Sequence, residues 1–193
     1  MIAYLKGKFA SKNPSTVIID VGGIGYEVNI SLNTYSTIQS LDEGLLFTHL
    51  LIKEDAHLLY GFADVREKDI FQALITVSGI GASTARMMLS YMKPDEIVAA
   101  IITGDCKSLE KVKGIGKKTA ERAVLELKDK IGKYSSGISV VVEQGSSVKQ
   151  DALEALFALG INKSMAEQTI IKVLKAEPDL QVEDLIKKVL KSI

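Results

Sequence analysis

Residues 112–127, "VKGIGKKTAERAVLEL", decide the fold together with a near copy at residues 77–89, "VSGIGASTARMML". In both copies a glycine, an isoleucine and a second glycine precede apolar residues at helical spacing. Glycine permits positive φ and lets another molecule approach the main chain, and the helix that follows presents free N–H groups and the positive end of its dipole. Each copy therefore predicts a binding site for an anion such as a phosphate. The glycines concerned are Gly79, Gly81, Gly114 and Gly116.

Neither copy fits a nucleotide-binding loop. A P-loop needs a glycine five positions before the glycine of "GKKT", and that position is Lys111. A dinucleotide-binding loop needs a third glycine where Thr84 and Thr119 stand. A single copy would fit a plain turn between two helices equally well. Two copies in register, each followed by threonine and alanine, favour a paired function.

The charges of the chain balance overall but are unevenly placed. It has 24 basic and 24 acidic residues among 193, yet residues 107–118 hold five lysines and one acid. Such a basic cluster indicates a nucleic-acid partner. The single cysteine, Cys106, excludes a disulfide framework, and no apolar run is long enough for a signal peptide or a membrane-spanning helix. We therefore expect a cytoplasmic protein with no membrane partner.

The fold class predicted from these patterns is multidomain α+β. Residues 1–63 contain five short runs rich in Val, Ile, Leu, Tyr and Phe, which predict a five-stranded barrel of the oligonucleotide-binding (OB) type. An SH3-like barrel would use the same residue types. Residues 64–132 show apolar residues at three and four residue spacing and predict an all-α domain that contains both glycine motifs.

The remaining residues predict a linker and a small helical domain. Glycine and serine flank a short apolar run in residues 133–147, which is typical of a flexible linker. Residues 148–193 predict three helices, with capping boxes at Ser147 to Gln150 and Ser164 to Glu167. We expect most of the apolar residues of the first of these helices in the core, with some surplus apolar surface left for a partner. These apolar residues are Leu153, Leu156, Phe157 and Leu159.

The doubled glycine motif resembles the helix–hairpin–helix motif, which holds DNA phosphates without reading bases. A more specific resemblance comes from the order of the segments: a barrel ending in "KEDAHLLYGF" (residues 53–62), the doubled motif with "KGIGKKTAER" (residues 113–122), a linker, and a tail similar to a ubiquitin-associated (UBA) domain. With "VGGIGYEV" at residues 21–28, this order resembles the RuvA family over the whole chain. That family comprises the Holliday-junction-binding subunits of the bacterial branch-migration complex, which act in recombination, DNA repair and the SOS response to DNA damage.

The resemblance implies a homotetramer that holds a four-way DNA junction open, and it leaves open whether one tetramer or an octamer covers the junction. It implies no catalysis and no cofactor, because ATP is used by a partner, the hexameric ATPase RuvB, which residues 148–193 would dock. The RuvC resolvase is a further candidate partner. Glu54 and Asp55 would form an acidic pin at the junction centre. The residues that would hold DNA phosphates are Gly79, Gly81, Ser83, Arg86, Gly114, Gly116, Lys117, Lys118 and Thr119.

Other readings remain open on the residues alone. A helix–hairpin–helix glycosylase could use Asp129 with Lys130, although both also fit the charged end of a helix. A nuclease would need clustered metal-binding acids, and we expect no metal site. A single-strand-binding barrel would need exposed aromatic residues, whereas those of the barrel mostly alternate like core residues. Finally, Lys113 replaces the proline often found before the second "GIG" in the family, which we expect to add a charge and loosen the turn.

Overall fold

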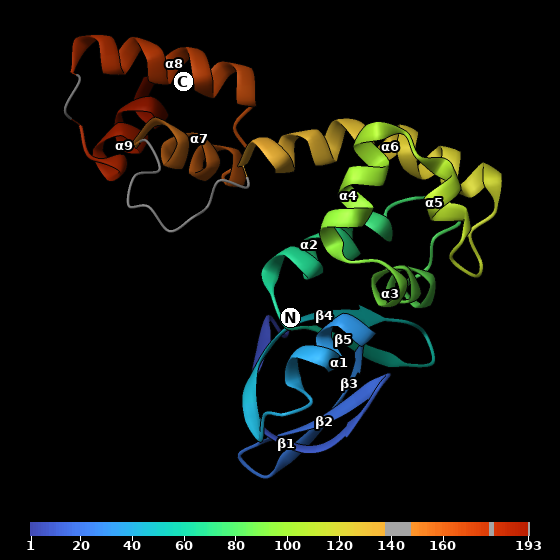
Figure 1. Cartoon of the computed structure of the whole chain (residues 1–193). Coiled ribbons are helices and arrows are strands. Elements are labelled where there is room, and N and C mark those ends of the chain that lie inside the picture. The colour runs from blue at the N-terminus through green and yellow to red at the C-terminus, as the bar shows by residue number, and fades with distance from the viewer. Residues whose placement is uncertain (138–147, 178–179, 193) are drawn as a thin grey trace. The chain divides into compact units, whose positions relative to one another are not determined.

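The computed structural model describes residues 1–137, 148–177 and 180–192, and the chain divides into two compact units, Met1–Ser139 and Val140–Ile193 (Figure 1). The first unit begins with a closed barrel in the strand order β1-β2-β3-β5-β4, antiparallel except for the parallel pair β3 and β5. All five predicted strands and the OB-like barrel are confirmed. The strands are β1 (Tyr4–Asn13), β2 (Thr16–Val21), β3 (Ile24–Ile30), β4 (Glu43–Ile52) and β5 (His57–Phe62).

The barrel closes because alternate side chains fill its interior and because β1 bends. Residues two apart on one strand, such as Val17 and Ile19, are both buried, as the period of a strand requires. The register of β1 against β2 shifts between Phe9 and Ser11, and such a bulge bends a strand. Before this bend, residues 4–8 of β1 pair with β4, which leaves the sheet without an open edge.

A short helix between β3 and β4 is missing from the sequence prediction. Helix α1 (Leu32–Ile38) begins after Ser31, whose side chain accepts a hydrogen bond from the backbone N–H of Thr34. Of its two buried residues, Thr34 is polar and only Ile38 is apolar, so no apolar period marks the helix in the sequence.

Five helices complete the first unit, and each was predicted. Pro94 stands at the start of α4, and Gly104, with φ of 76°, ends it. The predicted start of the linker at residue 133 is wrong, because α6 continues to Gly137: a glycine inside a helix weakens it without ending it. The rest of the predicted linker, residues 138–147, lies outside the described residues. The helices are α2 (Val65–Leu74), α3 (Ala82–Tyr91), α4 (Pro94–Thr103), α5 (Cys106–Glu110) and α6 (Lys117–Gly137).

One apolar core runs from the barrel into these helices. The ring of Phe71 in α2 lies 5.0 Å from that of Tyr60 and 4.9 Å from that of Phe62, both in β5. Beside this core the carboxylate of Glu67 is buried, and it accepts hydrogen bonds from the hydroxyls of Ser31 and Thr34. Burial raises the pKa of Glu67, because a low-dielectric surrounding disfavours the charged form. The barrel and the helical domain are therefore joined by buried apolar and polar contacts.

The second unit is a three-helix domain, as predicted, formed by α7 (Val148–Ala158), α8 (Lys163–Ala176) and α9 (Val182–Ser192). Leu153 and Leu156 lie in its core as expected, but Phe157 and Leu159 are 65% and 62% exposed. These two side chains supply the surplus apolar surface expected of this domain.

The start of α8 also differs from the prediction. Its N-cap is Asn162, whose side chain accepts from the backbone N–H of Ser164, so the predicted capping box from Ser164 to Glu167 is wrong. Asparagine competes well for this position, and the helix begins two residues earlier as a result. Ser147, which would open the other predicted box, lies outside the described residues. In the part of the chain that the structure covers, no helix combines the length and the apolar character needed to cross a membrane.

Candidate nucleic-acid interface

The two glycine motifs form the same turn. In the first copy the backbone N–H of Ile80 donates to the carbonyl of Val77 at 3.0 Å, and in the second Ile115 donates to Val112 at 3.0 Å. Both isoleucines are buried, so each turn is held by its central side chain in the helical core. The expectation that Lys113 loosens the second turn is wrong, because this hydrogen bond is as short as in the first copy.

The two glycines of each motif differ in backbone conformation. Gly79 and Gly114 both have φ of 95°, which is what the third position of a type II turn requires. Gly81 has φ of −83°, and Gly116 is not among the glycines with positive φ. Only the first glycine of each pair therefore uses the positive φ that glycine permits. The second marks the start of the following helix.

Glycine at that second position leaves a helix start without a side-chain cap. In this chain α1, α2, α5 and α8 each begin with a polar residue whose side chain accepts a backbone N–H. Helix α3 begins after Gly81 with no side-chain cap, and Gly116 before α6 has no side chain to provide one. The first-turn N–H groups of these two helices thus remain available for an anion.

The two hairpins also pack against each other reciprocally. The side chain of Thr119 lies 3.6 Å from where a Cβ on Gly79 would stand, and that of Thr84 lies 4.0 Å from the same point on Gly114. The guanidinium of Arg122 adds a 3.3 Å hydrogen bond to the carbonyl of Ser78. Thr119, which was predicted to bind phosphate, is thereby half-buried against the first copy.

The cations lie on the second copy. Lys117 and Lys118 are exposed in the first turn of α6. The corresponding residues of α3 are Ala82 and Ser83, which carry no charge, and Ser83 is exposed. The two copies thus offer similar main-chain groups with different side-chain charge.

Arg86 is engaged with the barrel. Its Nη1 donates to the carbonyl of Ser15 and to Oδ1 of Asn29, both at 2.9 Å. Sequence reasoning placed this arginine among the phosphate contacts because it follows the first hairpin. Its partners lie 71 and 57 residues away in the chain, so no local pattern reveals them.

Glu54 and Asp55 lie in the loop between β4 and β5, which extends from the barrel (Figure 1). The loop is closed by a 2.8 Å hydrogen bond from the backbone N–H of Lys53 to the carbonyl of Ala56. Both carboxylates are exposed, and neither has an ion pair or hydrogen bond among the described residues. They therefore present two uncompensated negative charges to the solvent.

The residues that a glycosylase, a nuclease or a single-strand-binding barrel would use are not part of the two glycine turns. Asp129 and Lys130 both fall in α6, but their side chains are outside the described part. Among the barrel aromatics Tyr4 is exposed, whereas Phe9, Tyr60 and Phe62 are buried. No group of three potential metal ligands occurs among the residues that the structure describes.

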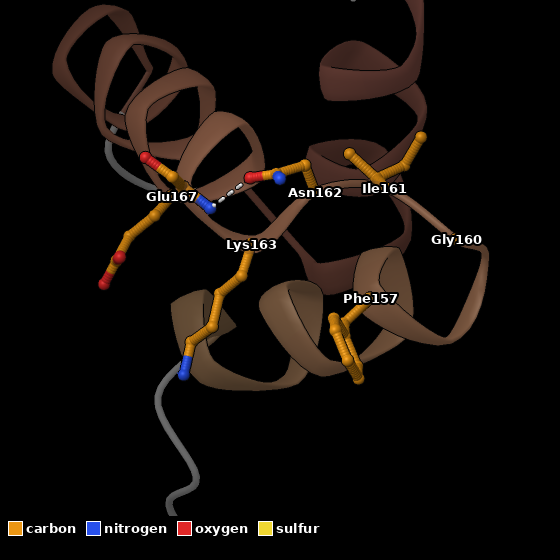
Figure 2. A pocket seen from close by; sticks show the side chains of 7 residues that line it. Phe157, Gly160, Ile161, Asn162, Lys163 and Glu167 are labelled. Atoms are coloured by element: carbon orange, nitrogen blue, oxygen red, sulfur yellow. Dashed lines mark hydrogen bonds between the residues drawn. The ribbon is translucent and has the colours of Figure 1, made fainter.

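The tail domain has a separate surface feature. A shallow cleft of about 780 Å³ lies where α7 turns into α8. Figure 2 shows Phe157, from the end of α7, and Lys163, from the start of α8, extending to the same side. With the exposed Leu159 and Met165, this corner carries the surplus apolar surface expected of the tail.

Known families and proteins agree with this architecture. Residues 1–61 match the RuvA N terminal domain, residues 71–129 the SAM-like helix-hairpin-helix tandem, and residues 147–193 the RuvA C-terminal domain. Curated relatives named Holliday junction branch migration complex subunit RuvA include one from Christiangramia forsetii, 48% identical over 193 residues, and one from Flavobacterium psychrophilum, 47% identical over 193 residues. A third, from Bacteroides fragilis, is 44% identical over 201 residues, and each alignment covers all of both proteins. The family expected from the sequence is thus confirmed: the chain belongs to the RuvA family.

Proposed function

We propose that this chain binds four-way DNA junctions by their structure and recruits a RuvB-type ATPase for branch migration, without catalysis or a cofactor of its own. The observation that carries the proposal is the pairing of two uncapped helix N-termini with an acidic loop on the adjoining barrel. The names of the full-length relatives support it over a glycosylase or nuclease.

Binding to phosphates would supply the attraction between the hairpins and DNA. The main-chain N–H groups after each "GIG" would donate to phosphate oxygens, and Ser83, Lys117, Lys118 and Thr119 would add side-chain contacts. Such contacts position the DNA without reading its sequence. Affinity should therefore fall steeply with salt and vary little with sequence.

The acidic pin formed by Glu54 and Asp55 would repel DNA phosphates. A carboxylate about 8 Å from a phosphate is repelled by about 0.5 kcal/mol in water and about 2 kcal/mol at an effective dielectric near 20. Repulsion from several copies disfavours a continuous duplex across the centre and tolerates a junction whose strands diverge there. Selectivity then comes from shape and charge, without base contacts.

The assembly that suits these parts is a homotetramer in the cytoplasm. A four-way junction has four arms, and a fourfold assembly would offer one pair of hairpins to each arm and four acidic pins to the centre. A second tetramer on the opposite face and the RuvC resolvase are further proposed partners. The tail, residues 148–193, would dock on RuvB through the apolar corner around Phe157.

Neutralising the two carboxylates of the acidic pin tests the proposal that the pin gives junction selectivity. Glu54→Gln with Asp55→Asn should retain junction binding and lose discrimination against linear duplex, measured by gel-shift titration of both DNAs. Glu43→Gln with Asp42→Asn, which neutralises an exposed acidic pair at the start of β4, serves as the control. Unchanged discrimination in the pin variant would refute the assignment of the pin.

Removing the tail tests the recruitment of the ATPase. A chain without residues 147–193 should bind junctions normally, because the hairpins and the pin lie in the first unit. It should fail to stimulate junction-dependent ATP hydrolysis by RuvB. Normal stimulation by the shortened chain would exclude the tail as the docking domain.

A further inference from the structure

The barrel and the helical domain are attached at two places of different character. At the first, apolar rings of β5 and α2 pack together beside the buried Glu67. At the second, α3 meets the barrel around a cleft of about 260 Å³. Because this second place is not closed by packing, its hydrogen bonds fix how α3 lies on the barrel.

Arg86 connects this second place to the strand that follows the acidic pin. From α3 its Nη1 reaches Asn29 in β3, and Nδ2 of Asn29 donates to the carbonyl of Leu59 in β5 at 3.3 Å. Strand β5 begins at His57, two residues after Asp55. A chain of two hydrogen bonds therefore links the helix of the first hairpin to the hairpin that carries the pin.

Further bonds hold the far end of α3. Nδ2 of Asn33 donates to the carbonyls of Leu89 and Met92, and the backbone N–H of Leu32 donates to the hydroxyl of Ser90. These contacts hold the C-terminal end of α3 against α1. Arg86 lies nearer the hairpin, where a small rotation of the helix displaces the phosphate site most.

We propose that Arg86 is a positioning residue for junction selectivity: it sets the first hairpin relative to the acidic pin rather than binding phosphate. The inference rests on the proposed function, because only a protein that both holds and repels DNA needs this spacing. Nη1 has two hydrogens, and the barrel accepts both of them. The planar fork of arginine suits this double contact, which a lysine cannot reproduce.

The test uses Arg86→Lys, Arg86→Ala, Asn29→Ala and the double variant Arg86→Lys with Asn29→Ala in the full-length chain. The readouts are the ratio of duplex to junction Kd at several salt concentrations and the unfolding free energy in urea. We expect each single variant to lower the ratio about fivefold, as the loss of one hydrogen bond allows. The double variant should lose no more than Arg86→Lys alone, because without the arginine contact Asn29 no longer links α3 to β5. The salt slope of duplex binding should stay unchanged.

Arg66→Lys is the matched control, because it makes the same exchange at an arginine whose partner, Asp95, lies within the helical domain, and it should leave the ratio unaltered. A normal ratio in Asn29→Ala would overturn the proposal, as would a fall in the salt slope of about one in Arg86→Ala, which indicates a phosphate contact. If Arg86→Lys fails to fold, the ratio of duplex to junction Kd in Asn29→Ala tests the proposal by itself. Failure of the proposed function is distinguishable, since the unaltered protein would then bind junction and duplex equally.

Discussion

The two hairpins of this protein share a backbone and differ in what surrounds it. Both have a type II turn closed at 3.0 Å, a glycine at φ of 95° and a buried isoleucine. The second copy places Lys117 and Lys118 where the first has Ala82 and Ser83. In the first copy, Arg86 donates hydrogen bonds to the barrel. In the second copy, Arg122 donates a hydrogen bond to Ser78 of the first copy. The same backbone is thus combined with different side-chain charges and different contacts in the two copies.

The largest difference between the copies should appear when the lysines are removed. Lys117→Ala with Lys118→Ala should weaken junction binding by between about tenfold and a hundredfold in 0.1 M salt and flatten the salt slope, because two phosphate contacts are lost per protomer. Binding isotherms on junctions of several sequences at different salt concentrations measure both quantities.

Lys6→Ala with Lys128→Ala removes the same charge from exposed lysines outside the basic cluster of residues 107–118 and should have a much smaller effect. A loss confined to some junction sequences would contradict a pure phosphate contact.

The similarity of the two turns predicts an equal cost for alanine at their glycines. Gly79→Ala and Gly114→Ala should each lower the free energy of unfolding by about 1–2 kcal/mol, since an L-residue is strained at positive φ. The added methyl group meets only ordinary contacts in both copies, at 3.6 and 4.0 Å. Urea denaturation of both variants measures the cost, and a clearly unequal loss would show that the turns differ in stability.

A charge added to the first copy should make it resemble the second. Ser83→Lys introduces a lysine at the position that corresponds to Lys118, and it should raise affinity for junction and duplex alike by about fivefold to tenfold at 0.1 M salt. The salt slope should steepen by about one. Unchanged affinity in gel-shift titrations would mean that the first helix start does not face a phosphate.

The smallest expected effect concerns the buried carboxylate on α2, the helix before the first hairpin. Since burial raises the pKa of Glu67 above its ordinary value of 4.5, the folded chain binds the proton more tightly than the unfolded chain does. The contribution of Glu67 to stability should therefore fall as pH rises from about 4.5 through the folded-state pKa. Glu67→Gln removes this titration.

Denaturation of both proteins at pH values from 4.5 to 7 measures the difference. The stability of Glu67→Gln relative to the unaltered chain should increase with pH. A difference that is constant or decreases would show that the folded state does not favour the protonated carboxyl.

Much of the fold followed from local patterns in the sequence. The strands of the barrel and eight of the helices were predicted because apolar residues recur with periods of two or 3.6 over several turns. Helix α1 was missed because one of its two buried residues is the polar Thr34, which leaves no apolar period to recognise. Asn162 was overlooked as a cap because Ser164 and Glu167 offered a competing pattern two residues later. Lys117 and Lys118 of the proposed phosphate site stood out because they follow the glycine motif directly.

By itself, the sequence determined the doubled turn, the helices after it and the basic cluster, because backbone preference and helix period act over a few neighbouring residues. The tertiary structure decided what these parts meet. Thr119 packs against Gly79, Glu67 is buried beside Ser31, and Arg86 reaches Asn29 rather than solvent. These pairs are between 36 and 57 residues apart, and their contact depends on how the barrel and the helices pack, which no local pattern encodes.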